Sequence, residues 1–168
     1  MQKDFERLFH RAEDHYLIPS EMIALKKHIG LLGKRLETYR YLRDNEAEIF
    51  QVVADRLEAD FPEEPSQKLE QCLCHWISTL RYSSMAMLLS NPEYLQYRLL
   101  EWLTEMIEAH ELRAIETRVS EILTEHLQKV LSAEGFNLLK PFLTQSETVL
   151  LAKTAPQSPQ LAMAGDKA

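Results

Sequence analysis

The sequence predicts an all-α protein, and three observations support this fold class. The chain has 168 residues but only four glycines and seven prolines, so few positions interrupt a long element. Apolar residues recur at steps of three and four over most of the chain, which is the period of an amphipathic helix. No segment alternates apolar and polar residues as a half-buried strand does. We therefore expect about six to eight helices.

The N-terminal third is expected to form a short helix followed by two longer ones. Apolar residues within 5–9 indicate a short N-terminal arm, which packs either on a partner subunit or, by default, on its own core. The next helix begins at Ser20, whose side chain can accept hydrogen bonds from free backbone N–H groups. Either Asp44 or Asn45 caps the third helix, whose first turn carries acidic residues that suit the helix dipole. Its apolar stripe continues to Phe61.

The clearest boundaries lie in the middle of the chain. Two prolines within 62–65 break the helical pattern, and Ser66 starts it again. The next helix is expected to carry residues 69–89. It is followed by Asn91, a favourable cap, and Pro92, which suits the first helical position because its missing N–H costs nothing there.

The C-terminal third continues the helical pattern. Apolar stripes predict helices over residues 95–107 and 112–131, and the second is expected to end at Gly135 as a left-handed C-terminal residue. A last helix over 136–151 contains Pro141, which should begin or kink it.

Trp76 and Trp102 lie within the helical pattern and are expected to be core residues. From Lys153 onward the chain is rich in Ala, Pro, Gln and Ser without periodicity. We therefore expect one helical domain over residues 1–152 and a disordered tail over 153–168.

Composition excludes several classes of function. The chain carries 19 Lys and Arg against 26 Asp and Glu, a net charge of −7, which argues against nucleic-acid binding. Its few glycines cannot form a phosphate-binding loop. No apolar leader and no run long enough for a membrane span occurs, so a cytoplasmic protein without membrane insertion is expected. The only two cysteines, Cys72 and Cys74, are poorly placed for a disulfide, as in a reducing compartment.

No catalytic or metal site is predicted. No histidine follows a glutamate by three residues, and the zinc-protease pattern that begins at His110 ends on Ala114. Cys72 and His75 share a helix face, but a structural zinc site needs a second pair that the chain lacks. We expect Cys72 to be a buried structural cysteine beside an exposed Cys74, and we expect the protein not to be an enzyme.

One stretch of the chain carries a collinear set of matches to a known protein family. The residues are Gln71-Cys72-Leu73, Leu80-Arg81-Tyr82, Ala86, Leu95 and Arg98. They resemble the phycobiliproteins, whose bilin-attachment helix has the pattern A-C-L-R-D-x-x-x-x-L-R-Y. The resemblance implies a globin-like phycobiliprotein fold with an N-terminal helical-pair extension, here residues 1–30, through which two subunits pair. It also implies a bilin, an open-chain tetrapyrrole, thioether-linked to Cys72.

The chain departs from this pattern where the family holds its pigment. The Arg-Asp pair that follows the attachment cysteine in the family is Cys74-His75 here. Its carboxylate would accept charge-assisted hydrogen bonds from the pyrrole N–H groups, and arginines would clasp the propionates. What remains is a reduced cofactor-binding set of Cys72, His75, Arg81 and Tyr82.

Three hypotheses follow from this degenerate pocket. The preferred one is a pigment-free structural, assembly or regulatory relative of the phycobilisome proteins, cytoplasmic or peripheral at the thylakoid surface. The alternatives are an antenna subunit that carries a bilin on Cys72, and a tetrapyrrole carrier or lyase-like protein. The partner is expected to be a phycobiliprotein-like subunit or a second copy of the chain, in a hetero- or homodimer formed through the N-terminal helices.

Overall fold

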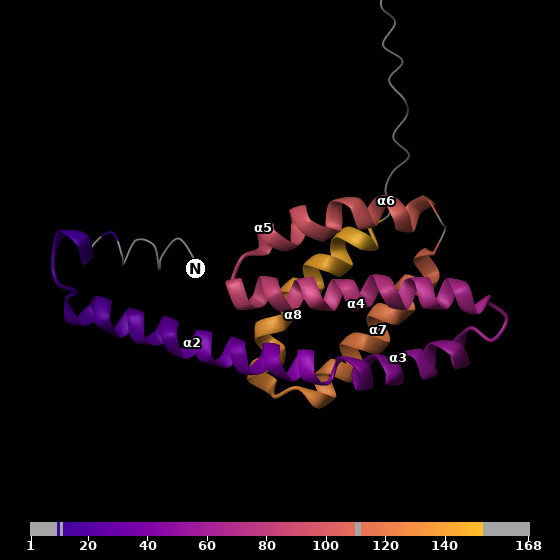
Figure 1. Cartoon of the computed structure of the whole chain (residues 1–168), viewed down its shortest axis with the longest axis horizontal. Helices are drawn as coiled ribbons and strands as arrows, with labels where there is room; N and C mark the ends of the chain where they lie inside the picture. Colours follow the sequence, from indigo (N-terminus) through magenta and orange to yellow (C-terminus); the bar gives the residue numbers. More distant parts are fainter. Residues whose placement is uncertain (1–9, 11, 110–111, 153–168) are drawn as a thin grey trace, which may run out of the picture.

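The computed structural model describes residues 10, 12–109 and 112–152, and it confirms the all-α prediction (Figure 1). No strand occurs within these ranges. The helices are α2 (Pro19–Asp44), α3 (Glu46–Asp60), α4 (Ser66–Leu89), α5 (Pro92–Leu95), the π-helix η1 (Gln96–Leu100), α6 (Glu101–Ala109), α7 (Arg113–Val130) and α8 (Ala133–Leu150). The helix expected at residues 5–9 and the tail expected at 153–168 lie outside the described residues.

Helix α4 lies in the middle of the molecule and contacts α2, α3, α7, α8, α5 and η1. One apolar cluster fills the space between α3, α4, α7 and α8. A second lies where α4 meets α5, η1, α6 and α8. Because its neighbours surround it, α4 presents a different environment at each end and on each face. None of the described helices is both long and apolar enough to cross a membrane.

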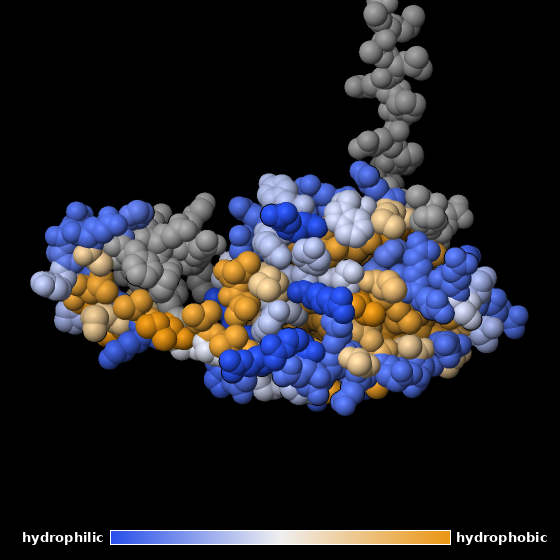
Figure 2. All heavy atoms as spheres, in the orientation of Figure 1, coloured by the Kyte–Doolittle hydropathy of each residue, from blue (hydrophilic) through white to orange (hydrophobic). Residues whose placement is uncertain are grey.

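Helix α2 is the longest element, with 26 residues, and only its C-terminal half packs on the body. Thr38 and Leu42 are buried there, whereas the N-terminal half projects past the other helices as an arm (Figure 1). We refer to residues 18–36 as the α2 arm. Large apolar side chains are exposed along it, as the orange atoms of Figure 2 show: Ile18, Met22, Ile23, Ile29, Leu32 and Leu36.

The start of α2 differs from the sequence prediction. Ser20 lies within the helix rather than at its cap, because Pro19 occupies the first helical position with its favourable fixed φ. The backbone N–H of Ile18 donates to the Glu21 carboxylate over 3.1 Å. The residue that precedes the helix is therefore bonded by a side chain from the first turn of the helix. Glu21 was not among the expected capping residues.

The other predicted boundaries agree more closely with the structure. Asn45 is the single residue between α2 and α3, but its side chain donates to the Tyr41 carbonyl instead of capping α3. Asn91 caps α5 as expected, accepting from the Tyr94 N–H over 3.2 Å, with Pro92 in the first position.

Gly135 does not end α7, contrary to the prediction. No described glycine has a positive φ, and Gly135 lies in the first turn of α8, where its N–H donates to the capping Ser132 hydroxyl. The reason for a glycine is close packing, since a Cβ at this position would lie 2.9 Å from the Thr38 hydroxyl of α2. Helix α8 also begins before Pro141 and continues through it.

Of the two tryptophans, only one is a core residue. Trp76 is 1% exposed in the centre of α4, as predicted. Trp102 is 47% exposed on α6, which corrects the prediction. Its indole N–H donates to the Arg98 carbonyl one turn earlier, so the ring lies along the helix surface.

Candidate functional site

All four predicted site residues lie on α4, but the structure divides them into two groups. Cys72 and His75 are one turn apart and face the protein interior. Arg81 and Tyr82 line a cavity between α2, α4 and α5. Arg81 follows Cys72 by nine residues, which places it roughly 13 Å further along the helix axis and on the opposite side of the helix. The two groups therefore do not meet.

The Cys72 thiol is sealed in the core, with no exposed surface, whereas Cys74 is exposed, as the sequence predicts. Burial raises the pKa of the Cys72 thiol, and the negative charge of the Glu116 carboxylate raises this pKa further. Since the thiolate is the reactive form of a cysteine, this environment keeps Cys72 in its inert, protonated form.

His75 forms a buried pair with Glu116 of α7. Its Nδ1 lies 2.6 Å from Glu116 Oε1, and the two side chains are 8% and 0% exposed. The second carboxylate oxygen, Oε2, is buried without a hydrogen-bond partner among the described residues. A carboxylate therefore does face this turn of α4, but it comes from another helix and is held by the histidine. We call Cys72, His75 and Glu116 the sealed cluster.

Glu116 was missed by the sequence analysis, although the sequence contains a signal for it. Apolar positions at Leu112, Ile115, Val119 and Leu123 define the buried face of α7, and Glu116 lies on that same face. A charged residue within an apolar stripe requires a buried partner. His75, which shares a helix face with Cys72, was already a candidate site residue, so it could have been proposed as the partner of Glu116.

The sealed cluster does not have the arrangement of a metal site. Three residues of metal-binding type lie together, yet no group of three or more His, Cys, Asp or Glu side chains in the described part of the chain could hold a metal ion.

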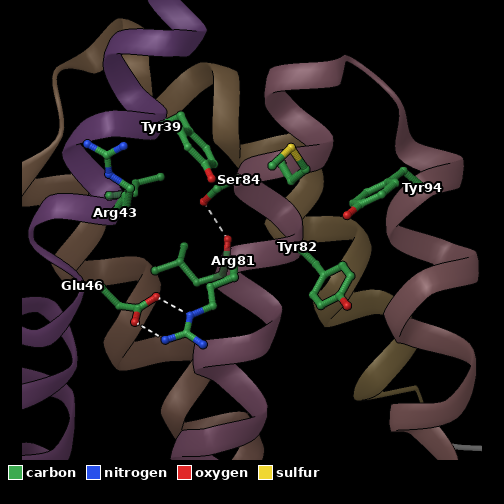
Figure 3. A pocket seen from close by; sticks show the side chains of 10 residues that line it. Tyr39, Arg43, Glu46, Arg81, Tyr82, Ser84 and Tyr94 are labelled. Atoms are coloured by element: carbon green, nitrogen blue, oxygen red, sulfur yellow. Dashed lines mark hydrogen bonds and ion pairs between the residues drawn. The ribbon is translucent and has the colours of Figure 1, made fainter.

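Arg81 and Tyr82 belong to a separate cavity of about 370 Å³ (Figure 3). Arg81 forms a two-fold ion pair with Glu46 of α3, with N–O distances of 2.7 and 2.5 Å. Tyr82 stacks on Tyr94 of α5, with ring centroids 5.9 Å apart and planes at 27°. We call this space the tyrosine cavity; its lining residues are Tyr39, Leu42, Arg43, Glu46, Leu80, Arg81, Tyr82, Ser84, Met85 and Tyr94.

The comparisons with known proteins agree with the fold and with the family pattern on α4. A family model described as "Phycobilisome protein" matches residues 11–144, well over half of the chain. The comparison with curated proteins gave no match. Members of the matched family are generally light-harvesting subunits rather than enzymes, typically bind bilin chromophores and assemble with one another. The chain belongs to the phycobilisome protein family.

Proposed function

We propose that this chain is a pigment-free structural or assembly member of the phycobilisome protein family. The observation that carries the proposal is the sealed cluster around Cys72. Thioether formation requires a thiolate with open space beside it for the tetrapyrrole. Cys72 has no exposed surface, and it lines neither the tyrosine cavity nor a second cavity of about 220 Å³ between α2 and α8.

The residues beside Cys72 do not fit a bilin. The family's acceptor for the pyrrole N–H groups corresponds to His75, and this side chain is already bound to Glu116 over 2.6 Å. The Arg81 guanidinium, a candidate for clasping a propionate, lies on the opposite side of α4 and is bound to Glu46. Both parts of the reduced clasp are therefore occupied by partners within the chain.

The second part of the proposal concerns assembly. The α2 arm exposes six large apolar side chains over a projecting helix, and a surface of this kind is usually covered by a partner. We propose that it pairs with a phycobiliprotein-like subunit or with a second copy of this chain. We also propose a cytoplasmic position, peripheral at the thylakoid surface, in keeping with membership of the phycobilisome protein family.

Co-expression with a bilin-producing and bilin-attaching system tests the pigment-free role. The wild type and Cys72→Ser are denatured in acidic urea, and their visible spectra are compared with those of a subunit that keeps the complete family motif. We expect absorbance only from that subunit. Covalent absorbance in the wild type but not in Cys72→Ser would instead establish the antenna alternative, and turnover of free bilin would establish the carrier or lyase alternative.

Light scattering after size exclusion tests the assembly role. We expect a defined oligomer that Ile23→Glu disrupts, since Ile23 is 69% exposed on the α2 arm. The control is Tyr97→Glu, which places the same charge at a residue 68% exposed near α6 and should leave the oligomer intact. A wild type that stays monomeric alone and with phycobiliprotein subunits would contradict this part of the proposal.

A further inference from the structure

One side of the α2 arm has the residue pattern of a helix that packs against another helix. Met22, Ile29 and Leu36 follow one another at steps of seven residues, and they are 44%, 57% and 38% exposed. Gly33 lies on the same side, between Ile29 and Leu36. A repeat of seven places side chains along one line of the helix, where a second helix can lie against them. We call this line the α2 seam.

Gly33 is not explained by contacts within the chain. Its φ is negative, so the backbone conformation does not require a glycine, and a Cβ at this position would meet no atom within 4 Å. Gly135 is different, because Thr38 of the same chain leaves no room for a Cβ there. A glycine inside an exposed helix destabilises it relative to alanine. A close approach by another molecule would explain why the seam has no side chain at Gly33.

Opposite charges lie on either side of Gly33. Lys26 is exposed one heptad before it, and Glu37 lies one turn after it with a side chain that is 75% exposed. Lys26 forms no ion pair with any described residue. The partner of Glu37 is Lys34, which is 3.6 Å from Glu37 and equally close to Glu134 of α8. Both charges of the seam are therefore available to a second molecule.

These charges fit a second copy of the seam that runs in the opposite direction. When two antiparallel helices are related by a twofold axis, residues at equal distances on either side of the axis face each other. An axis at position 31 places Ile29 of each copy against Gly33 of the other, so that a large side chain meets a position without one. The same axis places Lys26 beside Glu37 of the other copy, at both ends of the contact. A parallel pair would instead place each charge against its own kind, which is unfavourable.

We propose, on the basis of the assembly role above, that two copies of this chain form a homodimer through antiparallel α2 arms. The arms cross where Ile29 of one copy packs on Gly33 of the other, and two Lys26–Glu37 ion pairs set the register. The two bodies lie at opposite ends of the helix pair, because only the C-terminal half of α2 packs on its own body (Figure 1). Of the two partners considered for the arm, the seam therefore favours the second copy.

Reversing the two charges tests the register. The dimer dissociation constant of the full-length chain is measured by analytical ultracentrifugation. Lys26→Glu and Glu37→Lys should each weaken the dimer at least about tenfold, because the twofold axis repeats every like-charge contact. The double variant Lys26→Glu/Glu37→Lys should return to within about threefold of the wild type. An equimolar mixture of the two single variants should form a heterodimer as tight as the wild-type dimer, since opposite charges then meet at both ends.

The matched control for the charge variants is Lys27→Glu. It makes the same change in net charge at the next residue, which lies about 100° round the helix from Lys26 and outside the seam. It should leave the dissociation constant unchanged within about twofold. An effect as large as that of Lys26→Glu would mean that net charge, and not a specific contact, controls association.

Filling the space at Gly33 tests the crossing point. Leucine is a good helix former, and no atom of the chain lies within 4 Å of the added Cβ, so Gly33→Leu should keep the fold. We expect the dimer to weaken at least about tenfold, because the new side chain occupies the space that Ile29 of the other copy fills. Circular dichroism of the same variant should show helicity equal to or above that of the wild type.

Three results would overturn this inference. One is a wild-type chain that stays monomeric alone; if it pairs with phycobiliprotein subunits, the assembly role stands without the homodimer. Another is an oligomer that Ile23→Glu disrupts but Lys26→Glu and Gly33→Leu do not, which would mean that the arm pairs in a different register. The third is a double charge variant that remains as weak as the single variants, which would show that Lys26 and Glu37 do not face each other. None of these outcomes depends on whether Cys72 carries a pigment.

Discussion

The N-terminal half of α4, at Cys72, and its C-terminal half, at Tyr82, each carry a side chain that is paired with a glutamate of another helix. We call these two regions the sealed end and the open end of α4. Near Cys72, His75 and Glu116 form a hydrogen-bonded pair whose side chains are only 8% and 0% exposed. Near Tyr82, Arg81 and Glu46 form an ion pair with side chains 63% and 25% exposed. The distances are similar, so burial is what separates the two pairs.

This difference bears on the pigment-free role that we propose. At the sealed end, the imidazole of His75 and one carboxylate oxygen of Glu116 bond to each other within the core, and Cys72 stays protonated beside them. At the open end, the polar groups remain in contact with a cavity. The sealed end is part of the core, whereas the open end borders a cavity.

The largest expected effect is on thiol reactivity. Cys72 and Cys74 are two residues apart, but only Cys74 is accessible. In native protein we expect monobromobimane to label Cys74 quickly and Cys72 at least about a thousandfold more slowly, because labelling of Cys72 requires the fold to open. Measured with the two single Cys→Ser variants, similar native rates would show that the core end of α4 is open, and would weaken the pigment-free role.

The next effect is on stability. Glu116→Leu should lower the free energy of unfolding by about 3 to 5 kcal/mol, because it leaves His75 buried without its partner. Urea denaturation followed by circular dichroism measures this difference.

The double variant His75→Leu/Glu116→Leu provides the control, since an apolar pair of suitable volume often replaces a buried ion pair without loss. It should recover most of the lost stability. If both variants lose the same free energy, then packing, and not an unpaired polar group, explains the cost.

A smaller effect should appear at alkaline pH. The pKa of the Cys72 thiol is raised in the folded state above its ordinary value of 9.0, so the unfolded chain ionises first. The corresponding stability is fully present below pH 9 and is lost as the pH rises above it, by about 1 kcal/mol per pH unit. Stability curves of Cys72→Ser should lack this slope, and those of Cys74→Ser should keep it. Cys72→Ser should otherwise retain the wild-type helicity and oligomeric state.

The sequence predicts the helical elements well because their signals are local. The prolines at 62 and 65, the Asn91-Pro92 cap and the three- and four-residue periodicity each depend on a few neighbouring residues. Gly135 was misjudged because its role is a close approach to Thr38 of α2, nearly a hundred positions earlier in the chain. Trp102 was misjudged because the pattern gives a helix face but not what covers it.

The candidate site could be predicted only in part, because it too depends on contacts between residues that are far apart in the chain. The burial of Cys72 was expected from composition, but its partner Glu116 comes from α7, and pairing between helices depends on their packing. The spacing of nine residues between Cys72 and Arg81 does indicate opposite faces of one helix. What it does not indicate is that α2 and α5 approach there to form a cavity.

The smallest expected effect is at the exposed end of α4, where the two pairs are compared directly. Glu46→Gln should lower the free energy of unfolding by less than about 1 kcal/mol, because water already solvates both charges of an exposed pair. A loss of stability as large as that of Glu116→Leu would mean that the two ends of α4 are equally buried in solution. A loss below about 1 kcal/mol would mean that burial, and not the distance between the paired groups, sets how much each pair contributes to the stability of the fold.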